Sequence, residues 1–297
     1  MSNGFSSSSS VLLEEPECPS FEDCTRETAD CTWIFGNIRV WPIIEGGSRV
    51  EWTMHSSFSD AGPYVYQLQA GRTGSNDADD WVNIGLPVTN ACYAIDPEKR
   101  VYGKSQWTHY RLLLTTADGT YTSAPQPATG VLAKQDRLLA REIERKELLR
   151  LKKGAGQFGY LLKRRLFGTA CSCRDYITEE TTNPACELCY GTGFTGGYFE
   201  PVDYWAELTQ RKHRNHIEDP RGTVDDSPRA RLRGLNSPQV FSYDVWVDKD
   251  TDFRWIIHEV SHLVEVRGVP IIIGAEARLA PFSDVVYKFP VPGVGHS

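Results

Sequence analysis

Four cysteines set close together, Cys171, Cys173, Cys186 and Cys189, constrain the fold of this chain more than any other feature. The first residues have neither the basic region nor the long apolar run of a secretory signal, so we expect reduced thiols that act as metal ligands before disulfides. Four thiolates around one ion make a tetrahedral structural Zn²⁺ site with no position open for catalysis. The spacing therefore predicts a four-cysteine zinc knuckle over residues 169–199, in which metal binding contributes to folding.

Two alternatives to zinc stay open, namely an iron–sulfur cluster and four unrelated thiols. The first pair has one residue between its cysteines where two are usual, which makes Cys171 the least regular ligand. The second pair is followed by Gly191, which can take the positive φ that turns backbone N–H groups toward the sulfurs. Arg174 is placed to offset the negative charge of a tetrathiolate site.

The chain has 297 residues, of which 40% are hydrophobic and 11% aromatic, enough for about two domains with real cores. No apolar run approaches the roughly 20 residues of a membrane-spanning helix, so we expect no membrane span. The net charge of −7 argues against a general nucleic-acid binder. The charge is uneven, because residues 1–31 carry seven acids against one Arg, and residues 134–165 carry eleven Lys and Arg against four acids.

Residues 1–32 are predicted to form an acidic flexible arm, because they include five consecutive serines and many acids. Two interpretations remain, a disordered tail and an arm that orders on a neighbouring subunit during assembly. Cys18, Cys24 and Cys31 lie in this arm, and their role stays undetermined between late pairing, weak metal binding and no function.

Residues 33–129 are predicted to form a β-sandwich, since short β-branched and aromatic runs alternate with turn residues. The expected strands are 38–44, 49–53, 64–70, 81–84, 107–116 and 120–123. This region resembles a fibronectin type III or related immunoglobulin-like domain. Trp52 matches the core Trp of the second strand, Tyr110 the core Tyr of the sixth, and Asp118-Gly119 the following hairpin turn.

Residues 130–168 are predicted to form a helical linker, with leucines near one broad stripe and an i,i+4 pair between Glu142 and Lys146. The members of the stripe are Leu132, Leu138, Leu139, Ile143, Leu148, Leu149 and Leu151. The basic segment 134–165, with Lys163-Arg164-Arg165 at its end, could touch DNA phosphates. A solvated helix face or a salt-bridged subunit interface is the alternative.

Residues 200–297 are predicted to form a C-terminal β-rich assembly domain, with strands at 244–247, 253–266 and 270–274 and a loop at 221–234. His258-Glu259-Val260-Ser261-His262 matches the H-E-x-x-H motif of zinc proteases, which requires a helix. The β-branched, alternating surroundings predict a strand instead, in which the two histidines lie roughly 13 Å apart. We therefore expect no enzyme, with an H-E-x-x-H protease as a remote alternative.

The run GYLLKRRLFGTACSCRDYITEETTNPACELCYGTGFTGGYFEPV, followed by DVWVDKDTDFRWIIHEVSHLVEVRGVPIIIGAEARLAPFSDVVY, resembles a family of tailed-bacteriophage virion proteins. The resemblance covers residues 130–290 and implies a virion structural protein, assembled in the host bacterial cytoplasm. We favour a place in the neck, or head–tail connector, in contact with other neck and tail proteins. A homo-oligomeric ring is expected, because phage necks and tails are built from cyclic oligomers. The alternative is a baseplate or collar component whose sandwich binds the host surface.

Overall fold

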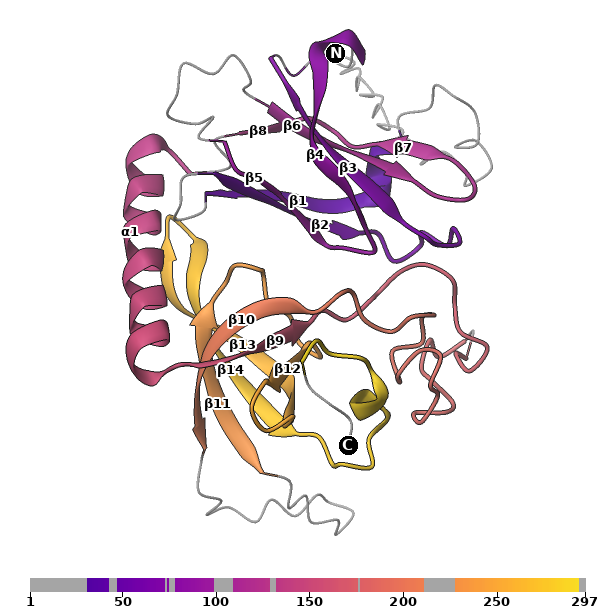
Figure 1. Ribbon diagram of the computed structural model, residues 1–297. Helices are drawn as coiled ribbons and strands as arrows, with labels where there is room; N and C mark the ends of the chain where they lie inside the picture. The colour runs from indigo at the N-terminus through magenta and orange to yellow at the C-terminus, as the bar shows by residue number, and fades with distance from the viewer. Residues whose placement is uncertain are drawn as a thin grey trace, which may run out of the picture.

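The computed structural model describes residues 31–42, 47–72, 74, 78–98, 109–128, 132–175, 177–210 and 228–293. The chain is mainly β, as predicted, and forms a sandwich and a barrel with helix α1 (Lys134–Arg150) along one side of both (Figure 1). Residues 1–30, which include Cys18 and Cys24, lie outside the described residues. The predicted acidic arm is therefore not tested.

The N-terminal unit is a sandwich of two antiparallel sheets, as the sequence predicted. One sheet has the order β1 (Phe35–Pro42), β2 (Ser48–Met54) and β5 (Tyr93–Asp96). The other has the order β4 (Trp81–Thr89), β3 (Val65–Gly71), β6 (His109–Thr115) and β7 (Thr120–Thr122), and β8 (Gln126–Pro127) pairs with β6. Strands β5 and β8 were not predicted, because each is too short to show a pattern in the sequence.

The sandwich core contains the two aromatic residues that carried the resemblance to immunoglobulin-like domains. Trp52 lies on β2 and is packed against Tyr66, with ring centroids 4.8 Å apart. Tyr110 is fully buried on β6, and its hydroxyl donates to Asp96 Oδ2 at 2.7 Å. Both residues therefore occupy the core positions that the sequence assigned to them.

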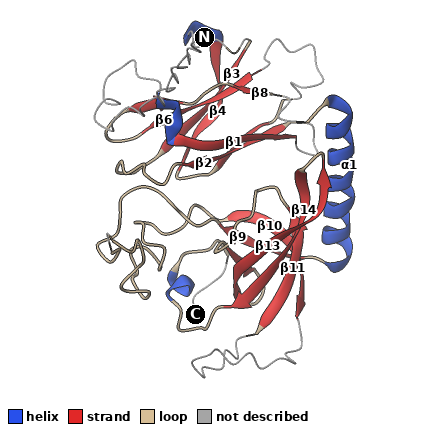
Figure 2. Ribbon diagram, turned by 180° about the vertical axis from the view of Figure 1, so that it is seen from behind, coloured by secondary structure: helices blue, strands red, loops and turns tan. Residues whose placement is uncertain are grey.

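Helix α1 continues through a short π-helical turn, η4 (Leu151–Ala155), and packs against the barrel and the edge of the sandwich (Figure 2). Its buried residues are Arg137, Ala140, Glu144 and Glu147. The predicted leucine stripe is buried only in part. Leu138, Leu139 and Leu149 are each about half exposed, at 45, 53 and 48%, whereas the other members are buried or packed against the core, namely Leu132, Ile143, Leu148 and Leu151. The predicted Glu142–Lys146 pair is confirmed, with Lys146 Nζ 3.4 Å from Glu142 Oε1.

The C-terminal unit is a closed antiparallel barrel (Figure 1). Its order is β10 (Val202–Gln210), β11 (Arg229–Leu235), β14 (Val269–Leu279), β13 (Arg254–Val266), β12 (Val245–Asp248) and β9 (Gln157–Leu162), and β9 pairs back onto β10. The short helices η2 (Cys31–Ile34), η3 (Ala78–Asp80) and η5 (Val285–Lys288) lie outside the strands.

The barrel corrects two sequence predictions. Residues 157–162, assigned to the helical linker, form β9, because Leu161 and Leu162 are completely buried between β10 and β12. Residues 229–234, assigned to a loop, lie in β11, in which arginines alternate with the buried Ala230 and Leu232. That alternation has the period of two expected of a strand, but Ala230 and Gly234 are too small to make the inward face look apolar in the sequence.

Candidate metal centre

The knuckle (residues 169–199) is an insertion between the first two barrel strands, β9 and β10. Its two ends meet, because the Arg165 N–H donates to Gly197 O at 2.9 Å and the Phe199 N–H donates to Lys163 O at 3.0 Å. The sequence placed the knuckle before the C-terminal domain, whereas the structure places β9 ahead of it. The insertion is therefore anchored at its base by strands of the same barrel.

The structure brings all four predicted cysteines together. Their Sγ atoms all lie within 4.8 Å of one another. The Sγ atoms of Cys171 and Cys186 are 3.7 Å apart, and those of Cys173 and Cys189 are 3.3 Å apart. These distances are far longer than the roughly 2.0 Å of a disulfide bond. Among the described residues, this is the group of Cys, His and acidic side chains that could hold a metal ion.

The second pair of cysteines lies in a tight turn whose backbone faces the sulfurs. The N–H groups of Cys189 and Leu188 lower the pKa of Cys186 to about 7, with Cys171 and Cys173 contributing further. Tyr190 and Gly191 follow with φ of 49° and 76°, which reverses the chain after Cys189. The Gly191 conformation is the one that the sequence predicted. The turn thus favours the thiolate of Cys186, the form that binds metal, whereas burial raises the pKa of Cys189.

The first pair is fixed by backbone bonds to both flanks of the knuckle. The Cys171 N–H donates to Gly193 O at 2.9 Å, and the Cys173 carbonyl accepts from the N–H and the hydroxyl of Thr182 at 2.8 and 2.9 Å. Isolated β-bridges join Ala170 to Phe194 and Arg174 to Thr181. Cys171 is buried within the group, so the single-residue spacing does not remove it from the cluster.

Two features of the cluster were predicted wrongly or not at all. Arg174 was expected to offset the charge of the sulfurs, but its guanidinium stacks on Phe194 at 4.4 Å and pairs with Glu179 at 3.2 Å. Gly197 was not singled out, yet a Cβ there would lie 2.8 Å from Cys189 O. The knuckle can therefore close only with glycine at that position.

The base of the knuckle is packed into the sandwich. Phe167 and Phe199 belong to the sandwich core, where Phe167 contacts Tyr64 at a centroid distance of 5.2 Å. The Gly168 N–H donates to Phe58 O at 2.8 Å. Sequence reasoning missed these contacts, since both phenylalanines lie far from the sandwich along the chain. The two ends of the knuckle therefore bind the sandwich and the barrel at once.

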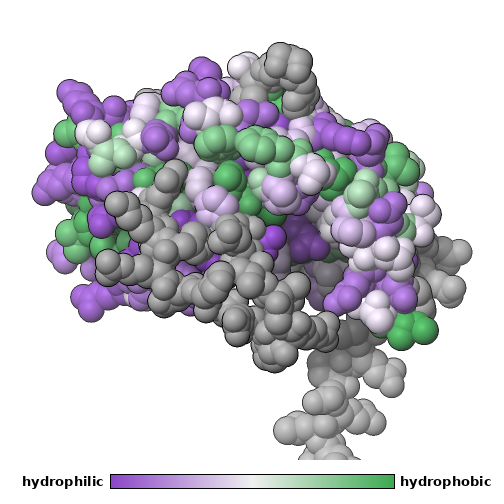
Figure 3. Space-filling view, turned by 90° about the horizontal axis from the view of Figure 1, so that it is seen from below, coloured by the Kyte–Doolittle hydropathy of each residue, from purple (hydrophilic) through white to green (hydrophobic). Residues whose placement is uncertain are grey.

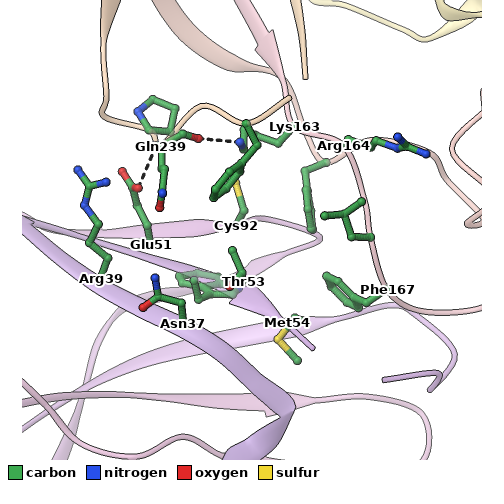
Figure 4. Close-up of a pocket in the computed structure, with 15 residues that line it drawn as sticks. Asn37, Arg39, Glu51, Thr53, Met54, Cys92, Lys163, Arg164, Phe167 and Gln239 are labelled. Carbon is green, nitrogen blue, oxygen red and sulfur yellow. Dashed lines mark hydrogen bonds between the residues drawn. The ribbon is translucent and has the colours of Figure 1, made fainter. Parts of the chain in front are cut away.

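A cavity beside this base shows how the two units meet (Figure 4). Glu51 of the sandwich accepts from the Gln239 N–H at 3.0 Å, and the Gln239 carbonyl accepts from Lys163 Nζ at 2.6 Å. Lys163 also forms a buried ion pair with Asp244. The contact between sandwich and barrel thus includes a continuous polar chain inside a mostly apolar surface.

Two of the three side chains of the predicted basic triplet, Lys163-Arg164-Arg165, are buried. Lys163 and Arg165 are 5 and 8% exposed, and Arg165 lies over the rings of Tyr64 and Phe199. In this conformation neither side chain is available to a DNA phosphate. Within the basic segment 134–165, the exposed basic residues lie on α1 and η4.

The H-E-x-x-H motif lies on a strand, as predicted. His258, Glu259 and His262 are exposed residues of β13, and His262 Nδ1 lies 2.8 Å from Glu265 Oε1. Register shifts at 257/259 and 262/264 mark bulges on either side of the motif. Neither histidine belongs to the metal-ligand cluster found among the described residues.

Comparison with protein-family models gives no match for this chain, and comparison with curated proteins gives none either. Within the described residues, no helix has the length and apolar character to cross a membrane. The chemistry of the site therefore rests on its own geometry, a closed group of four thiols supported by backbone N–H groups.

Proposed function

We propose that the four cysteines bind one structural Zn²⁺. A tetrahedral ion with Zn–S bonds of roughly 2.3 Å holds its sulfurs roughly 3.8 Å apart, and the observed separations of 3.3 and 3.7 Å lie near that value. All four donors are sulfur, which leaves no open coordination position. The ion would close a segment too short for a core of its own, and its binding energy would become folding energy.

We further propose that the chain is a structural protein of a tailed-bacteriophage virion, assembled as a ring in the neck. The observation that carries this proposal is the placement of the cluster, on an insertion whose base holds both sandwich and barrel. A metal that stiffens this junction would give a rigid two-part building block, as a closed ring requires. The sequence resemblance of residues 130–290 to virion proteins supports the same role.

Metal analysis tests the zinc proposal. The purified protein is expected to contain about one zinc per chain, and Cys189→Ser is expected to lose most of it, because three thiolates bind less tightly than four. Cys92→Ala is the matched control, since Cys92 is also buried but lies in the sandwich core. Zinc-free wild-type protein that folds normally, or equal zinc in Cys189→Ser, would contradict the proposal.

Imaging tests the virion proposal. Particles that contain a tagged copy of the protein are expected to show the label at the neck, and the purified protein is expected to form rings visible by electron microscopy. Label at the baseplate would favour the alternative position. Absence of the protein from purified particles would contradict the virion role altogether.

A further inference from the structure

Helix α1 buries Glu144 and Glu147 and exposes several bases and leucines, while Glu142 pairs with Arg145 and Lys146 at its surface. Glu147 is 6% exposed in its side chain and accepts from Arg150 and Arg233 at 2.8 and 2.9 Å, while Glu144 is buried near Trp41. Eight exposed residues of α1 and η4 carry either a positive charge or a leucine side chain. They are Lys134, Leu138, Leu139, Arg145, Lys146, Leu149, Lys152 and Lys153, which we call the helix face.

The helix face combines two properties that call for a protein partner. Half-exposed leucines between basic residues gain little from DNA phosphates, but they gain free energy when an apolar surface covers them. Seen from below, hydrophilic and hydrophobic residues lie side by side at the edge of the molecule where Figure 1 places α1 (Figure 3). The partner should therefore be acidic and carry exposed apolar side chains.

The knuckle has these properties. Residues 169–199 carry four acids against one Arg, and Glu179, Glu180 and Glu187 are exposed at its surface, where Glu179 pairs with Arg174 and Glu187 with Lys288. Ile177 and Leu188 are 89 and 65% exposed, which is unusual for large aliphatic side chains. A tetrathiolate zinc site would add further negative charge. We call the residues Ile177, Glu179, Glu180, Glu187 and Leu188 the knuckle face.

The two faces lie on opposite sides of the molecule, with α1 at one side and the knuckle at the other in both ribbon views (Figures 1 and 2). A single copy cannot join them. Two copies in the same orientation can, because the knuckle face of one then meets the helix face of the next. Such a head-to-tail contact is heterologous, and it builds a ring when the rotation between copies closes.

We propose that the occupant of the helix face is the knuckle face of a second copy of this chain. This inference rests on the proposed ring assembly and names its interface. Opposite charges would bring the copies together and set their orientation, and the leucines would meet Ile177 and Leu188 at the centre of the contact. The metal would then order the surface that one subunit offers to the next.

Photocrosslinking of the full-length protein tests the interface. A photoreactive residue replaces Leu139, and a matched control replaces Leu86, which is 87% exposed on β4 of the sandwich. Isotopically heavy and light copies are mixed, so that crosslinks between copies are recognised by mass. The expected result is crosslinks from position 139 to residues 177–188 of another copy. Crosslinks to residues 1–30 would make the acidic segment the occupant, and crosslinks within one copy would exclude a contact in trans; either overturns the proposal.

A charge exchange gives an independent test. Lys152→Glu with Lys153→Glu, and separately Glu179→Lys with Glu180→Lys, are each expected to weaken association roughly tenfold, measured by light scattering. All four substitutions together are expected to restore most of it, with metal content unchanged throughout. Rings that form equally well in both double variants would refute this interface while leaving the ring itself standing. Wild-type protein that never forms rings would instead refute the ring.

Discussion

Lys163 is a buried residue that links the barrel to the polar contacts between the two units. Its ammonium group is buried, pairs with Asp244, donates to the Gln239 carbonyl and lies 4.3 Å from the centre of the Phe241 ring. Gln239 in turn donates to Glu51 of the sandwich. Removal of a buried charge leaves its partner uncompensated, which costs far more than the loss of a surface pair.

Lys163→Met is therefore expected to lower the free energy of unfolding by about 3–5 kcal/mol, measured by urea titration at fixed zinc concentration. Lys288→Met is the control, because Lys288 pairs with Glu187 at the surface, and it should cost under about 1 kcal/mol. Equal effects of the two substitutions would show that the Lys163 pair is not desolvated as the structure indicates.

Glu144 gives the protein a pH-dependent stability. Burial raises the pKa of this carboxyl from its ordinary 4.5 to about 7, although Trp41 and Arg49 act in the opposite direction. The folded protein thus holds the proton more tightly than the unfolded chain. The resulting stabilisation is complete below about pH 4.5 and is lost as the pH rises to about 7.

Between pH 5 and pH 8 the Glu144→Gln variant is expected to lose less stability than the wild type, by up to about 3 kcal/mol, because a neutral amide does not titrate. Urea titrations at the two pH values measure this difference. Glu142→Gln on the same helix is the control, since Glu142 is exposed and its pKa is lowered by Arg145. Parallel pH profiles for wild type and Glu144→Gln would rule out a buried, raised-pKa carboxyl.

At the scale of elements, α1 shows what periodicity can and cannot reveal. The helix was predictable from its charge pairs and apolar spacing, and Glu142 pairs with Lys146 as expected. Its orientation was not predictable, because Glu147 is satisfied by Arg233 of β11 and Arg150 holds Glu207 of β10 at 2.7 Å. These ion pairs to the barrel helped to decide which face turned inward, and Leu138, Leu139 and Leu149 were left exposed.

Leucine substitutions measure that orientation. Leu151→Ala, at a completely buried position, is expected to cost about 2–5 kcal/mol because it leaves a cavity. Leu139→Ala, at a position 53% exposed, is expected to change the free energy of unfolding of the monomer by less than about 0.5 kcal/mol. Urea unfolding at protein concentrations too low for assembly measures both effects. A large loss of unfolding free energy in Leu139→Ala would show that Leu139 faces inward, against the assigned orientation of α1.

For the whole molecule, the sequence was informative wherever a pattern was local. The sandwich strands, the strand around His258 and the cysteine cluster all follow from spacing within a few residues. The barrel closure does not, because β9 lies before the knuckle, and its strand character arises from pairing with β10 and β12. The packing of Phe167 and Phe199 into the sandwich is likewise a long-range contact that no local pattern shows.

The position of β9 predicts how the protein responds to loss of metal. With a chelator present, limited proteolysis is expected to cut first within 171–189, because backbone bonds alone then hold the knuckle. The two fragments should separate on a denaturing gel yet elute together from a sizing column, since β9 stays paired with strands from the other fragment. Fragments that part under native conditions would contradict the barrel topology.

Closure of the barrel also affects how copies of the protein can contact one another. An open sheet ends in a row of unpaired N–H and C=O groups, on which the chain of another molecule can add as an extra strand. Here β9 pairs back onto β10 and closes the barrel, so the described strands of the C-terminal unit offer no such template. Many copies can then lie close together without strand addition between their barrels. Contacts between these barrels are made by side chains, and single substitutions can weaken or strengthen them.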